Sequence, residues 1–293
     1  MPTATPPAPP APPSTAARLR PAAAAAALLL AAALHPAAAP AGAQEAPPEL
    51  VTDRPDQTES AVTVAPGLVQ LEAGVDHSEE GGDPGAESTA LGASLLRIGL
   101  AERLELRLGW GGWAREEEGG AEIEGAADGE IGLKVGFWEA AGARPQAALL
   151  AGVSVPAGER GLSSERWDPA LRLSLAHDLG RGVGLGYNLG MAWSSEEAAG
   201  ASGSGLREAT SRLEYTVALG FDLSERLGAF VEVFGDAPVD SPPGGAGPAH
   251  AADAGITWLA TPRLQLDLAA GAGLSDAAPD FLATAGISVR WPR

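Results

Sequence analysis

The clearest feature of the chain is an alternation of apolar and polar positions that recurs from about residue 68 onward. In 104–110 the even positions are leucine or tryptophan, and the odd positions are charged or glycine. In 183–193 large apolar side chains alternate with glycine, asparagine and alanine. A period of two puts the apolar residues on one face of a β-strand and the polar or small ones on the other. The pattern therefore predicts amphipathic strands.

About twelve such strands can be placed, most of them about ten to thirteen residues long. Globular strands are usually about five or six residues, whereas about 9–11 residues cross a bilayer at a tilt. The predicted strands are 68–77, 88–98, 103–113, 127–138, 145–155, 168–178, 183–194, 209–222, 226–236, 251–260, 263–273 and 280–291.

The predicted connections alternate between long and short along the chain. The long ones are 78–87, 114–126, 156–167, 195–208, 237–250 and 274–279, and the short ones are 99–102, 139–144, 179–182, 223–225 and 261–262. Outer-membrane barrels have tight periplasmic turns and longer external loops. The sequence thus predicts an all-β protein, a transmembrane barrel of about 12 antiparallel strands, with both termini periplasmic.

Tryptophan positions support a membrane-spanning barrel. Seven of the aromatic residues are tryptophan, and they gather at predicted strand ends, where membrane interfaces select amphipathic rings. A lumen of this size is too wide to be filled by alanine, valine and leucine, so the apolar face is expected to contact lipid. The predicted interface girdle is Trp110, Trp138, Trp167, Trp193, Trp258 and Trp291.

The first 43 residues have the order of a secretory signal. Arg18 and Arg20 precede the apolar run 22–34, and Ala41-Gly42-Ala43 offers a cleavage site. We expect 1–43 to be a cleaved signal peptide, 44–67 a periplasmic segment that could plug the pore, and 68–293 the barrel. The expected location is the outer membrane.

Composition narrows the chemistry. A net charge of -19 argues against nucleic acid as a partner, because few cations could neutralise phosphates. The absence of cysteine excludes thiolate metal sites and a cysteine nucleophile. The acidic loop residues match no calcium-binding template. We therefore predict no cofactor and no metal site.

Strand alternation directs a mixed set of charges toward the lumen. Such a set can form rings that tune selectivity slightly against anions, or structural ion pairs without contact to a solute. The predicted lumen charges are Glu72, Glu105, Arg107, Glu130, Lys134, Arg172, Arg212, Glu214, Glu232, Asp267 and Arg290, together with Asp128 and Asp253.

Two further groups have open interpretations. Asp53, Arg54, Asp56 and Glu59 precede the first strand. They could fold into the lumen as a plug, with Arg54 paired to wall carboxylates, or form a periplasmic turn. Two inward aromatic residues could line a path for aromatic solutes or cover a plug. These are Phe230 and Phe234.

Several segments resemble a known family. The N-terminal block is Thr52-Asp53-Arg54-Pro55-Asp56-Gln57-Thr58-Glu59-Ser60, and later blocks are Gly129–Lys134, Leu150–Pro156, Trp167-Asp168-Pro169, Phe230–Gly235 and Ala285–Trp291. They are similar to an outer-membrane transporter family named for the meta-pathway of phenol degradation. The resemblance implies an outer-membrane barrel that passes small, often aromatic, molecules. The chain departs from the common barrel ending, since Pro292 and Arg293 follow the last aromatic residue.

We therefore predict passive or facilitated passage of small solutes. The expected partners are outer-membrane lipids, lipopolysaccharide, the barrel-assembly machinery and a small permeant. One alternative is a non-conducting structural or surface-interaction barrel. A third, a lipid-modifying enzyme, is disfavoured because His77 and Ser78 are adjacent and cannot share a strand face.

Overall fold

The computed structural model describes residues 48–82, 84–197, 207–240 and 247–292. The predicted signal peptide lies outside these residues. Within them, no helix is long and apolar enough to cross a membrane.

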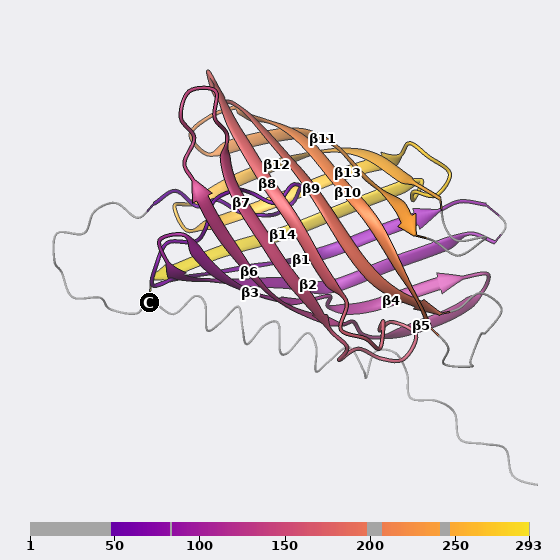
Figure 1. Ribbon diagram of the computed structural model, residues 1–293. Helices are drawn as coiled ribbons and strands as arrows, with labels where there is room; N and C mark the ends of the chain where they lie inside the picture. Colours follow the sequence, from indigo (N-terminus) through magenta and orange to yellow (C-terminus); the bar gives the residue numbers. More distant parts are fainter. Residues whose placement is uncertain (1–47, 83, 198–206, 241–246, 293) are drawn as a thin grey trace, which may run out of the picture. The chain divides into compact units, whose positions relative to one another are not determined.

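The described residues form one antiparallel sheet of 14 strand elements, and the sheet is closed because β1 pairs with both β2 and β14 (Figure 1). The elements are β1 (Leu68–Glu80), β2 (Ala86–Ala101), β3 (Leu104–Trp110), β4 (Trp113–Glu118), β5 (Ala121–Ala126), β6 (Gly129–Trp138), β7 (Gln146–Val155), β8 (Pro169–Gly180), β9 (Val183–Glu197), β10 (Arg207–Asp222), β11 (Leu227–Asp240), β12 (Ala249–Thr261), β13 (Leu264–Gly273) and β14 (Phe281–Pro292).

Four of these elements make up only two strands of the barrel. Both β3 and β4 pair with β2, and their opposite neighbours are β6 and β5. Backbone bonds cross the break between them, from Gly111 N to Asp128 O and from Ala127 N to Gly112 O, each 2.9 Å. The barrel therefore has twelve strands, as predicted.

The structure differs from the prediction at two connections. Most of 114–126 is the β4–β5 hairpin, and half of 78–87 belongs to β1 and β2. In the β4–β5 hairpin, Gly119 and Gly120 make the turn at positive φ, which glycine adopts at little cost. The hairpin carries many charges and both its faces are largely exposed, so no apolar alternation marks it as strand.

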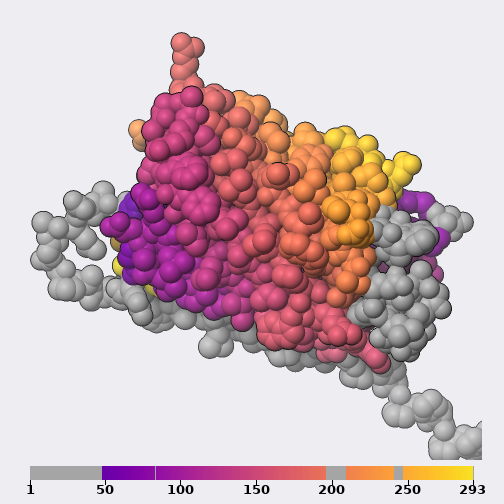
Figure 2. Space-filling view, in the orientation of Figure 1, coloured from indigo at the N-terminus to yellow at the C-terminus, as the bar shows by residue number. Residues whose placement is uncertain are grey.

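The two faces of the barrel wall differ as the alternation predicted. On the outside, Leu189, Ile131 and Val217 are 54%, 46% and 45% exposed, while the inward Glu105 and Lys134 are fully buried. Figure 2 shows the outer face as an unbroken wall across the strands coloured magenta to orange. Such a surface needs hydrocarbon around it, because soluble monomers rarely expose contiguous apolar area on this scale.

The tryptophans form two groups along the strands. Trp138, Trp258 and Trp291 lie at the turn rim, the end that carries the connections 102–103, 139–145, 181–182, 223–226 and 262–263. Trp110, Trp167 and Trp193 lie toward the opposite end, the loop rim.

One detail of the girdle was wrong. The strands of Trp110 and Trp193 do not end there but continue to Glu118 and Glu197, because strands can extend past the bilayer into water. From Val183 to Trp193 the strand rises about 33 Å, or about 25 Å along the normal at a tilt of about 40°, which fits the apolar band of such barrels.

A charge placed on the outer face should show where this band lies. Leu189→Arg is expected to lower the free energy of unfolding by about 2–4 kcal/mol, because Leu189 lies midway between the rims. Val239→Arg, on the similarly exposed Val239 near the loop-rim end of β11, should cost at most about 1 kcal/mol. Urea unfolding in detergent or lipid vesicles measures both variants. Equal losses would contradict the assignment of the lipid-facing band.

Candidate functional site

Residues 48–66, here called the inner segment, form no helix or strand, and their middle part, from Val51 to Val64, bonds inward-facing side chains of the barrel. Their backbone N–H groups instead donate to side-chain oxygens of the wall, which satisfies buried polar groups without secondary structure. These bonds join Asp53 to Glu72 (2.9 Å), Gln57 to Glu232 (2.7 Å), Glu59 to Asn188 (2.7 Å) and Val64 to Glu105 (2.8 Å).

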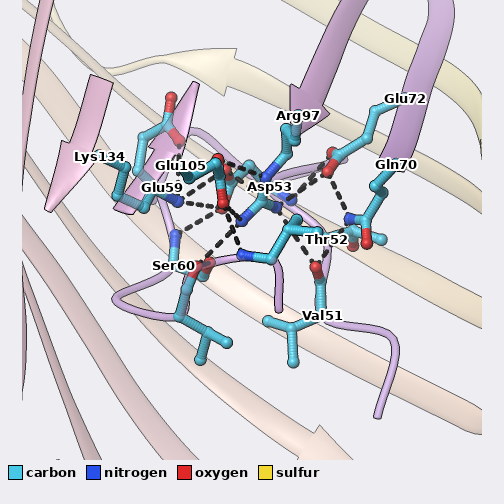
Figure 3. A network of polar contacts seen from close by, with 12 residues as sticks. Val51, Thr52, Asp53, Glu59, Ser60, Gln70, Glu72, Arg97, Glu105 and Lys134 are labelled. Atoms are coloured by element: carbon cyan, nitrogen blue, oxygen red, sulfur yellow. Dashed lines mark hydrogen bonds and ion pairs between the residues drawn. The ribbon is translucent and has the colours of Figure 1, made fainter. Parts of the chain in front are cut away.

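Arg97 of β2 is the centre of a buried ionic network between the wall and the inner segment (Figure 3). Its guanidinium is 3.1 Å from Asp53, 3.0 Å from Glu72 and 2.8 Å from Glu105. It also donates to the carbonyl oxygens of Val51 and Val62. This one side chain therefore contacts the inner segment at three places.

Lys134 and Arg107 continue the network on the neighbouring strands β6 and β3. Lys134 Nζ lies 2.8 Å from Asp53, and Arg107 lies 2.5 Å from the same carboxylate. Arg107 also donates to both carboxylate oxygens of Glu59, at 2.9 and 2.7 Å. Three cations thus face four carboxylates, because Asp53, Glu59, Glu72 and Glu105 all belong to the network.

The pKa values of two carboxyls of the inner segment, Asp53 and Glu59, are shifted in opposite directions. Burial alone would raise the pKa of Asp53, but Arg97, Lys134 and Arg107 together hold it well below its ordinary value. Burial raises the pKa of Glu59 to about 7, against the opposing attraction of Arg107. The pKa of Glu59 therefore lies well above that of Asp53.

Attachment of the inner segment should depend on pH. In a released segment Glu59 has its ordinary pKa of about 4.5. Protonation of Glu59 therefore stabilises the attached state fully below that pH, and this stabilisation is lost as the pH rises through about 7. Asp53 does not add to this dependence, because its pKa is held well below its ordinary value. Proteolysis of the segment is therefore expected to accelerate from pH 5 to pH 8.

The matched variant for this prediction is Glu59→Gln, which cannot titrate. Its cleavage rate, divided by that of a non-titrating exposed site in the same protein, should rise less over the same pH range, because Glu59 no longer contributes while Asp56 of the inner segment, whose pKa burial also raises, still titrates. An equal acceleration in both proteins would mean that Glu59 does not control attachment.

Sequence reasoning missed Arg97 because a bulge reverses the alternation of β2. Gly74 pairs with Ala93 but Val75 pairs with Leu91, so Gly92, at a φ of +73°, is left out of the ladder. The inward positions are even before the bulge and odd after it. The only signal in the sequence was the adjacent pair Leu95-Leu96, which had blurred the strand pattern.

Arg54 of the inner segment lies against two glycines of the wall. Gly74 and Gly286 are cross-strand partners, and a Cβ on either would collide with the Arg54 guanidinium. The guanidinium is 3.5 Å from Asp76 and 3.6 Å from Asp267. The glycine pair thus makes the space that lets Arg54 reach carboxylates on both sides.

The other predicted lumen charges take different places. Arg172 is 2.8 Å from Glu214 and 3.7 Å from Glu59, and Arg212 pairs with Asp236 outside the network. Arg290 donates to the carbonyls of Pro48 and Glu49, at the start of the inner segment. Glu130 faces the lumen and remains exposed.

The two aromatic candidates also differ. Phe230 is 7% exposed and lines a cavity of the lumen, whereas Phe234 is half-buried in the wall. Both share the inward face of β11 with Glu232, while Val231 and Val233 face outward.

Two cavities extend through the lumen from the inner segment toward the two rims. The loop-side cavity, about 470 Å³, reaches Ser78, Ser88 and Leu282. The turn-side cavity, about 690 Å³, reaches the 181–182 turn and Phe221. Arg54, Pro55 and Asp56 line both cavities. These three residues therefore lie between the two cavities.

The sequence matches the model of a protein family over residues 52–291, and that family is described as "Putative MetA-pathway of phenol degradation". The chain belongs to this family. The matched range includes all the strands and most of the inner segment. None of the curated proteins compared with the chain matches it.

Two solved structures share the fold of this family member. An outer membrane channel from Pseudomonas putida F1 has a TM-score of 0.62 at 14% identity, with 79% of this chain and 98% of that chain covered. The NanC porin has a TM-score of 0.50 at 8% identity, with 75% and 98% covered. Both comparisons confirm the predicted class, a transmembrane antiparallel β-barrel.

Proposed function

We propose that this protein is an outer-membrane channel for small solutes, in which the inner segment narrows the path. The observation that carries the proposal is the pair of cavities that extend toward opposite rims and share Arg54, Pro55 and Asp56 in their linings. The turn-side cavity passes over Gly184, Gly220 and Gly228, where the wall has no side chains. A solute could therefore pass beside the inner segment without displacing the buried network.

The family and the fold support the same proposal. The family description refers to phenol degradation, and Phe230 places an aromatic ring in the turn-side cavity. We therefore propose an aromatic or similarly apolar small permeant. We further propose that residues 1–43 are a cleaved signal, that the turn rim faces the periplasm, and that lipopolysaccharide and the assembly machinery are partners.

Planar-bilayer recording of the purified chain tests the channel. Steady openings, together with uptake of a labelled aromatic solute into liposomes, are expected. The absence of both conductance and uptake would favour the non-conducting barrel, in which the ionic network would seal the lumen.

A specific arrangement also supports a second candidate, hydrolysis of a lipid ester. On the outer face, His77 bonds Thr89 Oγ1 at 2.9 Å and Glu79 at 3.1 Å, which is the order of a nucleophile, a base and an acid. Ser78 lines the loop-side cavity on the other face. The backbone at Thr89 pairs with β1 and β4, so its N–H is unavailable to stabilise an oxyanion, and we favour the channel. Phospholipid turnover that is abolished by His77→Ala would reverse this preference.

A further inference from the structure

Asp253 of β12 is a buried carboxylate without a partner. The residue is 7% exposed, and neither carboxylate oxygen has a hydrogen-bond partner in the described part of the chain. An unpaired charge in such a place costs several kcal/mol unless something neutralises it. The other unpartnered inward carboxylate, Asp267, differs because Arg54 is 3.6 Å away.

The neighbours of Asp253 add negative charge and open space. Its cross-strand partner on β11 is Glu232, whose oxygens accept from Gln57 N and Thr58 Oγ1 of the inner segment. Its partner on β13 is Gly271, which has no side chain to cover the carboxylate. Asp56 of the inner segment, also without an ion pair among the described residues, lines the loop-side cavity with Asp253.

The cations of the loop-side cavity are already engaged. Arg54 contacts Asp76 and Asp267, and Arg172 contacts Glu214 and Glu59. Asp53 and Glu59 of the lining are already paired with cations of the network, whereas Asp56 and Asp253 have no ion pair among the described residues. A positively charged solute in this cavity would therefore be attracted to Asp253, while an anion would be repelled.

We propose that Asp253, with Glu232 and Asp56 beside it, binds a monovalent cation, either an alkali ion or a protonated amine. The unpartnered carboxylate of Asp253 offers one negative charge, which favours a singly charged, partly hydrated ligand. The site makes the path cation-selective, and this selectivity rests on the proposed channel function.

Reversal potentials under a potassium chloride gradient test the selectivity in the full chain. The wild type is expected to prefer potassium over chloride, and Asp253→Asn should reduce that preference at least about twofold. Glu130→Gln makes the same change of charge at a lumen position that lines neither cavity of the path, and it should leave the preference unchanged. If wild type and Asp253→Asn both conduct with equal selectivity, the proposed cation site is wrong but the proposed channel function is not contradicted.

A binding measurement separates the site from conduction. Crystals of the wild type soaked in caesium chloride should show anomalous density beside the Asp253 carboxylate, and crystals of Asp253→Asn should not. Such density in a protein that does not conduct would support the site while the channel proposal fails. Absence of the density in the wild type would overturn the site even in a conducting protein.

Discussion

Arg97→Met is expected to lower the free energy of unfolding by about 3–5 kcal/mol, the usual cost of removing one partner from a buried ionic network. The change removes ion pairs to Asp53, Glu72 and Glu105. It leaves Asp53 and Glu105 with Arg107 or Lys134 and leaves Glu72 without an ion pair among the described residues. The inner segment should also become accessible to protease, since the Val62 carbonyl loses its Arg97 donor and the Val51 carbonyl keeps only Gln70. Urea unfolding in detergent and limited proteolysis give the two readouts.

The matched variant is Arg115→Met on the β4–β5 hairpin. Arg115 contacts Glu117 and Glu122, and all three side chains are about half exposed, so its loss should change the free energy of unfolding by less than about 1 kcal/mol. Similar losses for the two arginines would mean that the network around Arg97 does not hold the inner segment.

The double variant Arg54→Ala, Asp56→Ala should raise single-channel conductance about twofold or more. The reason is geometric: both residues line the loop-side and turn-side cavities and lie between them, so truncation of their side chains opens the narrowest part of the path, which dominates its resistance. Planar-bilayer recordings at fixed salt concentration measure the effect.

The control for the conductance prediction is Arg212→Ala, Asp236→Ala. This pair also joins an arginine to an aspartate inside the barrel, but neither residue lines either cavity. Its conductance should stay at the wild-type level. If the Arg54 and Asp56 double variant also conducts as the wild type does, solutes do not pass between these side chains.

The barrel could be predicted because lipid on one side and a polar lumen on the other impose a local rule on every second residue. The same rule failed where its cause was missing. The β4–β5 hairpin has two largely exposed faces and so shows no alternation. In β2 the bulge at Gly92 reversed the parity, and Arg97 was overlooked for that reason.

The site was harder to predict than the fold. The plug and turn interpretations of Asp53 and Arg54 had remained open, because the inner segment has no periodicity of its own. Its partners come from strands that are far apart in sequence, such as Glu72 on β1 and Glu232 on β11. Spacing along the chain carries no information about which of these carboxylates meets which N–H group.

By itself, the sequence determined the strands, their number and the face that each turns to lipid, since these depend on the identity of neighbouring residues. Only the tertiary structure decided that residues 48–66 enter the lumen, that three cations share four carboxylates there, and that Asp253 has no partner. Closure of the sheet brings these groups together, and their pairing depends on distances across the barrel that strand alternation does not determine.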